Sequence, residues 1–336
     1  MDKTVIFAVA GSGKTTHIVN SLSREKRSLI ITYTIANYEN LYKKIIRKFD
    51  GEWPNNITLM RYFTFLYGFC YKPFLADIVK ARGIIYEPNP NRYALKSDRK
   101  FYITETGYLY SNRISLLLEV MHTIDDIKDR ISTYFDELII DEVQDIAGRD
   151  FDFLERIMET NVNQLFVGDF YQHTFDTSRD GNVNANLFES KRNYEKRFTD
   201  KGFVCDNNTL MNSWRCNPVV CKFVTDNLGI EMYSNRSFTG NEIITMVSEP
   251  DQKKLIVDNS DVVKLHYQKA ASFGDGHYNW GETKGQDHYN DVCVCLNKTT
   301  AKAYAAGELS KLKPAPRNKL YVAITRAHGN VYFTTE

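Results

Sequence analysis

A glycine-containing turn near the start most constrains what this chain can fold into. Residues 8–16 read AVAGSGKTT, follow the short apolar run Thr4–Phe7 and lead into a helix-compatible segment through Leu22. A strand, a glycine turn, Lys-Thr and a helix form the context that a phosphate-binding loop needs. The glycines let successive N–H groups point at phosphate oxygens, and the helix start adds a partial positive charge. The stretch therefore predicts a nucleotide-binding α/β fold.

Each polar residue of this loop has an expected role. Lys14 would neutralise the β- and γ-phosphates, and the Thr15 hydroxyl would bind Mg²⁺. The first glycine of the general pattern is Ala8 here, and such a loop by itself can also be an inactive remnant. The predicted nucleotide-binding residues are Ala10, Gly11, Ser12, Gly13, Lys14, Thr15 and Thr16.

The next segments continue an alternation of strands and helices. The run Ser28–Thr34 is typical of a buried strand, a helix with an apolar face follows, and Ile57–Met60 predicts a third strand. This order indicates right-handed crossovers and a parallel sheet, whose ligands sit at the carboxyl ends of the strands. Tyr33 and Thr34 are therefore placed to contact a ligand, although Tyr33 is equally compatible with a packed core tyrosine.

A pair of carboxylates ends another apolar run. In LIIDEVQD, residues 138–145, three apolar residues precede Asp141 and Glu142. Asp141 would hold Mg²⁺ and Glu142 would orient the attacking water, whereas without the upstream loop the pair would indicate only a solvated turn. Gln172 follows the strand 164–168 and is suited to sensing a γ-phosphate. Asp141 and Thr15 are the predicted metal ligands.

Composition limits the classes of function. The 336 residues are enough for two domains, and the net charge of +1 requires any basic surface to be local. The sequence has no apolar run of the ~20 residues that span a bilayer and no signal peptide, so we expect no membrane partner. Six cysteines without metal-ligand spacing indicate a reduced, cytoplasmic setting.

Two further stretches bear on organisation. Residues 61–69 are unusually aromatic and either stack on unpaired bases or fill a core. From residue 83 the regular pattern fails, and basic residues there lie along a polyanion or on a solvated surface. We expect an insertion at about 83–130, a first domain over 1–178 and a second over 179–336.

The order of the motifs resembles that of the UvrD/Rep-type superfamily 1 helicases along nearly the whole chain. The first and fourth matches are AVAGSGKTT and LIIDEVQD, and the T-F-H-S-F region lacks its His. The other stretches that carry the resemblance are ITYTIANYENL, Phe63-Thr64-Phe65, VGDFYQHTF, LMNSWRC, TKGQDHYNDVCV and LYVAITRA.

The resemblance implies an α/β fold with two RecA-like P-loop NTPase domains, parallel sheets and a short insertion in the first. ATP and Mg²⁺ would lie in the cleft, and Arg215 and Arg326 would be arginine fingers. The implied catalytic residues are Lys14, Asp141, Glu142, Gln172, Arg215 and Arg326. Trp214, Gly285 and Asp287 would join the loop in binding the nucleotide. The implied nucleic-acid contacts are Tyr33, Thr34, Phe63, Phe65, Phe175 and Trp280.

The resemblance also implies an activity. We expect ATP-dependent movement along single-stranded DNA or a single-strand/duplex junction, 3′→5′, in the cytoplasm of a bacterium or phage-infected host. The short stretch between Arg215 and Gly281 leaves no room for the family's large accessory subdomain, so a protein partner is expected to replace it. Two alternatives remain: a nucleotide-gated nucleic-acid-binding subunit, and an RNA-directed helicase, because stacking does not discriminate sugars.

Overall fold

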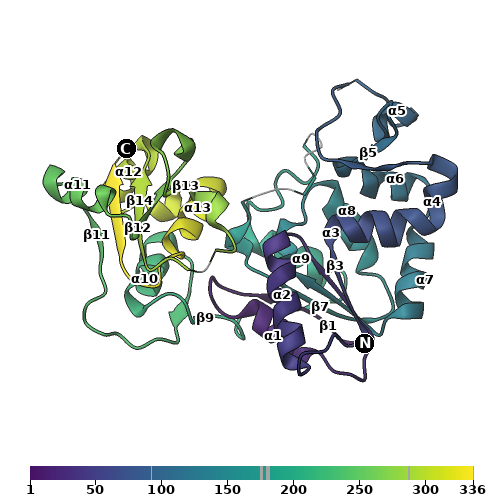
Figure 1. Cartoon of the computed structure of the whole chain (residues 1–336), viewed down its shortest axis with the longest axis horizontal. Helices are drawn as coiled ribbons and strands as arrows, with labels where there is room; N and C mark the ends of the chain where they lie inside the picture. Colours follow the sequence, from purple (N-terminus) through teal and green to yellow (C-terminus); the bar gives the residue numbers. More distant parts are fainter. Residues whose placement is uncertain (92, 175–176, 179–181, 287, 336) are drawn as a thin grey trace. The chain divides into compact units, whose positions relative to one another are not determined.

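The chain forms two compact units in a computed structural model that describes residues 1–91, 93–174, 177–178, 182–286 and 288–335. The first unit holds most of the chain up to Asp206, and the second holds Asn207–Glu336. Two short segments that follow strands of the first unit, Phe7–Lys14 and Asp169–Thr174, pack with the second unit. Figure 1 colours the first unit purple to teal and the second mainly green to yellow.

A six-stranded sheet in the order β3-β2-β6-β7-β1-β8 forms the centre of the first unit. Its strands are β1 (Lys3–Phe7), β2 (Ser28–Thr32), β3 (Ile57–Arg61), β6 (Glu137–Asp141), β7 (Asn163–Gly168) and β8 (Val204–Asp206). The pairs β1–β8, β2–β3, β2–β6 and β6–β7 are parallel. Every residue of the neighbouring strands β2 and β6 is buried, as expected where helices cover both faces of a parallel sheet.

Helices connect these strands. They are α1 (Lys14–Ser21), α2 (Ile35–Lys48), α3 (Tyr62–Thr64), α4 (Lys72–Val79), α6 (Ile114–Val120), α7 (Ile124–Tyr134), α8 (Arg149–Ile157) and α9 (Lys191–Thr199). A π-helical turn, Phe65–Tyr71, joins α3 to α4. Helix α2 begins where it does because the Thr34 side-chain oxygen accepts a hydrogen bond of 3.1 Å from the Asn37 backbone N–H.

The irregular stretch of the first unit contains a small sheet of its own. Strands β4 (Gly83–Ile85) and β5 (Tyr108–Tyr110) form a separate two-stranded parallel sheet, with α5 (Arg99–Tyr102) between them. Helix α6 buries five of its residues and packs against α8, so it belongs to the layers around the main sheet. The bounds of the insertion, expected at about 83–130, stay a prediction.

A second parallel sheet, in the order β11-β15-β14-β12-β13, organises the second unit. Its strands are β11 (Ile244–Met246), β12 (Val262–His266), β13 (His277–Asn279), β14 (Asp291–Leu296) and β15 (Val331–Thr335). A small parallel pair, β9 (Asn212–Ser213) and β10 (Tyr233–Ser234), stands apart from it. The helices are α10 (Pro218–Phe223), α11 (Pro250–Asp258), α12 (Lys298–Ala305) and α13 (Pro314–Ile324).

The fold class predicted from the sequence is confirmed, because both units are α/β with parallel sheets. In the structure α9 and β8 belong to the first unit, because β8 pairs with β1. The single domain boundary after residue 178 stays a prediction. Within the described part of the chain, no helix combines the length and the apolar character needed to cross a membrane.

Candidate functional site

The phosphate loop has the backbone that the sequence predicts. It follows β1, and α1 begins at Lys14. Gly11 and Gly13 have φ angles of 70° and 91°, in the region that side chains other than glycine rarely adopt. The turn therefore ends at a helix N-terminus, where free N–H groups and the helix dipole favour an anion.

The loop packs closely against the LMNSWRC stretch of the second unit. The Trp214 backbone N–H donates to the Gly11 carbonyl at 2.8 Å. A Cβ atom on Gly11 would lie 2.6 Å from the Arg215 Cβ, so glycine is required for this approach. A Cβ atom on Gly13 would lie 3.8 Å from the Trp214 ring, and that ring is 66% exposed. An exposed indole thus lies beside the loop, and its role in stacking on a base stays a prediction.

Tyr321, on α13, connects the loop to a second motif. Its hydroxyl accepts a hydrogen bond of 2.8 Å from the Ala10 backbone N–H and donates one of 2.9 Å to Asp169 Oδ2. The side chain is completely buried, and burial together with the Asp169 carboxylate raises the pKa of Tyr321 well above its ordinary value. The LYVAITRA motif contains this residue, but sequence reasoning gave it no role.

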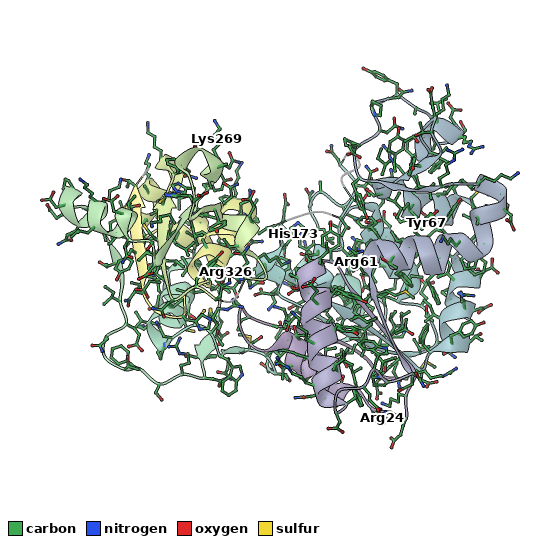
Figure 2. All side chains as sticks on the ribbon, viewed as in Figure 1. Arg24, Arg61, Tyr67, His173, Lys269 and Arg326 are labelled. Atoms are coloured by element: carbon green, nitrogen blue, oxygen red, sulfur yellow. The ribbon has the colours of Figure 1, made fainter. Side chains whose placement is uncertain are left out.

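Both predicted arginine fingers lie in the second unit and are held by backbone carbonyls. Arg326 Nη1 donates to the carbonyls of Thr283 and Gln286, each at 3.2 Å, and its side chain is 1% exposed. Arg215 Nη1 donates to the Thr325 carbonyl at 3.1 Å. The two guanidinium groups are therefore tied to neighbouring residues, and Figure 2 labels Arg326 in this unit.

The carboxylate pair ends β6 as predicted. Asp141 is the last residue of the strand, and Glu142 has a φ angle of 57°. Gln144 Nε2 donates to Glu142 Oε2 at 2.5 Å, which fixes the direction of this carboxylate. A Cβ atom on Gly168 would lie 2.3 Å from Gln144 Oε1, so this glycine makes room for the amide. Gln144 was not among the predicted site residues, although it is part of the D-E-x-Q-D motif.

The donor atoms expected for the metal suit Mg²⁺. Thr15 offers a hydroxyl and Asp141 a carboxylate, both hard oxygen donors, and both residues belong to the first unit. The part of the chain that the structure describes contains no group of three or more His, Cys, Asp or Glu side chains arranged for a metal. Mg²⁺ commonly uses one or two protein oxygens plus substrate phosphates, so this donor set is sufficient for it.

Two predicted nucleotide contacts have distinct settings. Gln172 ends a 3₁₀ turn, Phe170–Gln172, and is 4% exposed. Gly285 has a φ of 82°, which favours glycine at this turn. Asp287 lies outside the described residues. Their roles stay predictions.

An aromatic group lies at the carboxyl ends of β2 and β3. The Tyr33 and Phe63 ring centroids are 6.1 Å apart, and Tyr86 packs edge-on to Phe63 at 5.3 Å. Burial, with the carboxylates of Asp145 and Asp150, raises the pKa of Tyr33 to about 12, so its hydroxyl stays neutral. Tyr86 is 65% exposed and directly follows β4. The sequence predicted only an irregular stretch there, and Tyr86 was not among the predicted contacts.

Two expected base contacts are corrected by the structure. Phe65 is 2% exposed and stacks on Phe69 at 5.5 Å inside the first unit, because their spacing of four residues puts both rings on one helix face. Trp280 is fully buried, and its indole N–H donates to the Leu265 carbonyl at 2.9 Å. Neither ring is open to a base. Phe175 lies outside the described residues.

Comparison with known structures agrees with this fold. The helicase of an arterivirus, nonstructural protein 10, matches in its complex with DNA with a TM-score of 0.52 and 15% identity, over 98% of this chain and 60% of that one. A crystal structure of arterivirus nonstructural protein 10 (helicase) matches at a TM-score of 0.51 and 15% identity, over 98% of this chain and 59% of that one. This chain thus spans about 60% of the length of these helicases. The likeness agrees with two RecA-like domains.

The family comparison identifies the chain more directly. No curated protein matches the sequence. A family model described as the viral superfamily 1 RNA helicase core domain matches residues 115–335, more than half of the chain. Superfamily 1, predicted from the order of motifs, is confirmed, whereas the match is to a viral RNA helicase family and not to the UvrD/Rep subgroup. The chain belongs to the viral superfamily 1 RNA helicase core domain family.

Proposed function

We propose that the chain is the motor core of a helicase that hydrolyses ATP to move along single-stranded RNA. The observation that carries this proposal is the contact of Gly11 with Arg215, which brings the phosphate loop to a predicted arginine finger. Fingers act by stabilising transition-state charge, so hydrolysis would respond to small movements of the segment that bears Arg215.

Each residue of the site has a role in this proposal, taken from the UvrD/Rep resemblance. Lys14 binds the β- and γ-phosphates, and Thr15 and Asp141 hold Mg²⁺. Glu142 orients the attacking water, and its hydrogen bond from Gln144 supports that role. Trp214, Arg326, Gln172 and Gly285 complete the nucleotide site. The 3′→5′ direction rests on the UvrD/Rep resemblance alone, to which the family match does not extend, so the test below includes both directions.

RNA is preferred to DNA as the substrate because of the family match. The three rings of Tyr33, Phe63 and Tyr86 supply stacking surfaces, each worth about 1–3 kcal/mol per base, and stacking is independent of the sugar. The single-stranded DNA reading of the sequence is thereby less favoured than its RNA alternative. The viral family makes an infected host cell the proposed place of action, with a protein partner in place of the absent accessory subdomain.

One observation favours a second candidate, a nucleotide-gated binding subunit. The Ala10 N–H, a donor expected to face phosphate, is already bonded to the Tyr321 hydroxyl. Nucleotide binding would then exchange this bond for one to phosphate and move α13. In that case ATP controls RNA binding, and strand separation is not required.

Strand displacement distinguishes the two. Purified protein is mixed with Mg²⁺-ATP and duplexes that carry a 3′ or a 5′ single-stranded overhang, made of RNA or of DNA. The motor proposal predicts displacement of an RNA duplex with one of the two overhangs, lost when ATP is replaced by a non-hydrolysable analogue. ATP-dependent RNA binding without displacement on any duplex would overturn the motor and support the gated subunit.

A further inference from the structure

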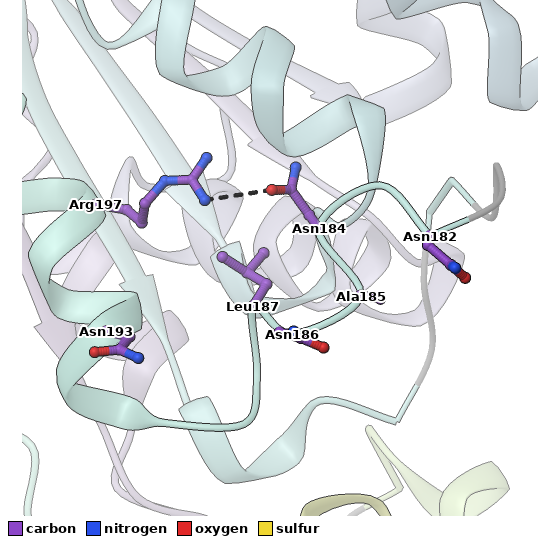
Figure 3. A pocket seen from close by; sticks show the side chains of 7 residues that line it. All are labelled: Asn182, Asn184, Ala185, Asn186, Leu187, Asn193 and Arg197. Carbon is purple, nitrogen blue, oxygen red and sulfur yellow. Dashed lines mark hydrogen bonds between the residues drawn. The ribbon is translucent and has the colours of Figure 1, made fainter.

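Two cavities of the first unit are each lined by an arginine, and the two arginines differ in their hydrogen-bond and ion-pair partners. The larger, of about 580 Å³, lies beside an asparagine-rich loop (Figure 3). Its Arg197 donates to both oxygens of Glu155, at 2.5 and 2.6 Å, and to Asn184 Oδ1 at 3.3 Å. This arginine is paired with Glu155 within the unit, and no other charged side chain is among the described residues that line this cavity.

The second cavity, of about 330 Å³, is lined by Arg130, which in the described part of the chain has aromatic rings and not a carboxylate beside it. Arg130, on α7, holds its guanidinium 4.8 Å from the Phe69 ring centroid and 5.1 Å from that of Tyr134. Its Nε is buried and has no hydrogen-bond acceptor, and among the described residues Arg130 forms no ion pair. Arg130 as a whole is only half-buried, so the remainder of its guanidinium can meet an acceptor that enters the cavity.

The walls of this cavity limit what the ligand can be. Met60, Phe69 and Phe135 supply apolar surface, and Asn55 supplies an exposed amide at the mouth. Arg27 also lies there, but it already binds Asp136 with Nη2–Oδ1 at 2.7 Å. One unpaired cation between apolar walls favours an anion with an apolar body over a strongly hydrated one such as inorganic phosphate.

The location separates this cavity from the nucleotide chemistry. Asn55 and Phe135 lie two residues before β3 and β6, and Met60 lies within β3, so the cavity extends from the amino edge of the first sheet along β3. Asp141 and Glu142 follow the carboxyl end of β6, at the opposite edge. The two sites therefore use different ends of the same strands.

We propose that this cavity, defined by Arg130, Phe69, Phe135 and Met60, binds a carboxylate carried on an apolar or aromatic group. The carboxylate takes the free donors of Arg130 as a charge-assisted pair, and the apolar body covers Met60 and Phe135. A cavity of about 330 Å³ suits one such group, either a small aromatic acid or a carboxylate at the end of a peptide.

Ligand-detected NMR and calorimetry with 3-phenylpropionate test the site, with 3-phenylpropanol as the neutral probe. We expect the acid to bind at least about tenfold more tightly than the alcohol, since a charge-assisted bond is lost. Arg130→Gln should remove this preference, and Arg130→Lys should restore part of it. Arg24→Gln is the matched control, because Arg24 also lies over a phenylalanine ring, that of Phe49, outside the cavity.

Two further measurements identify the source of the ligand and check that the variant is folded. Peptides ending in a free or an amidated phenylalanine distinguish a protein partner, which predicts tighter binding of the free peptide, from a small acid, which predicts binding of 3-phenylpropionate alone. ATP hydrolysis by Arg130→Gln should equal that of the wild type, which shows an intact fold. Equal binding of acid and alcohol, no binding of either probe, or unchanged binding by a folded Arg130→Gln would overturn the proposal.

Discussion

The two units position their functional groups in different ways. In the first, Asp141 and Tyr33 come directly at or after the ends of strands, so the sheet alone places them. In the second, Tyr321 and Arg326 lie inside the unit and are positioned by hydrogen bonds to segments distant in sequence. Groups of the first kind can be located from a strand pattern, and groups of the second kind depend on tertiary contacts.

The largest expected effect comes from the loop that packs with the second unit. Lys14→Ala removes the charge that faces the phosphates, so we expect ATP hydrolysis to fall by roughly 10²–10³-fold or more. Steady-state phosphate release measures this. Lys43→Ala, on the exposed face of α2, is the control and should keep full activity. Hydrolysis retained by Lys14→Ala would place the chemistry elsewhere.

Phe65 and Tyr86 are a buried and an exposed aromatic residue of the first unit, and their substitutions should have different effects. Phe65→Ala should lower the free energy of unfolding by about 3–5 kcal/mol, because it leaves a cavity in the core. Tyr86→Ala should leave stability nearly unchanged but weaken single-stranded RNA binding by about 1–3 kcal/mol. Urea unfolding and fluorescence anisotropy give the two values. The reverse assignment of effects would contradict the account of this face.

Asp150 is a buried carboxyl group of the first unit, and its titration should affect stability. Burial raises its pKa from 3.8 to about 6, and Ser115 Oγ donates to Asp150 Oδ1 at 2.7 Å. The native state therefore keeps the proton between about pH 4 and 6 while the unfolded chain loses it, so this residue's contribution to stability falls as pH rises through that window.

Asp150→Asn removes that loss. At pH 7 it should raise the free energy of unfolding by up to about 3 kcal/mol, and at pH 4 it should have little effect. Urea unfolding of both proteins at several pH values measures the difference. A mutant that is destabilised equally at pH 4 and pH 7 would show that Asp150 serves through hydrogen bonds and not through its proton.

Tyr321→Phe is the smallest and most selective change. It deletes the hydroxyl between Ala10 and Asp169 and leaves the ring, at a cost of about 1–2 kcal/mol in stability. If the hydroxyl couples the loop to α13, the KM for ATP and the stimulation by RNA should change together. A loss of stability with unchanged KM for ATP and unchanged stimulation by RNA would show that the Tyr321 hydroxyl has only a structural role.

The contrast between the units explains what the sequence could predict. The parallel α/β class, the loop and the acid pair were predictable because strand and glycine patterns are local. The predicted base contact of Trp280 is not available because the ring is buried, with its indole N–H bonded to the Leu265 carbonyl on β12, fifteen residues away. Tyr321 was missed because its partners, Ala10 and Asp169, are brought to it only by the fold.

The measurement that tests the central claim most directly is steady-state ATP hydrolysis by the whole chain without nucleic acid, with single-stranded RNA and with single-stranded DNA of the same base sequence. The account predicts slow hydrolysis alone and strong stimulation by RNA, exceeding that by DNA. Hydrolysis that neither nucleic acid changes would contradict an RNA-driven motor.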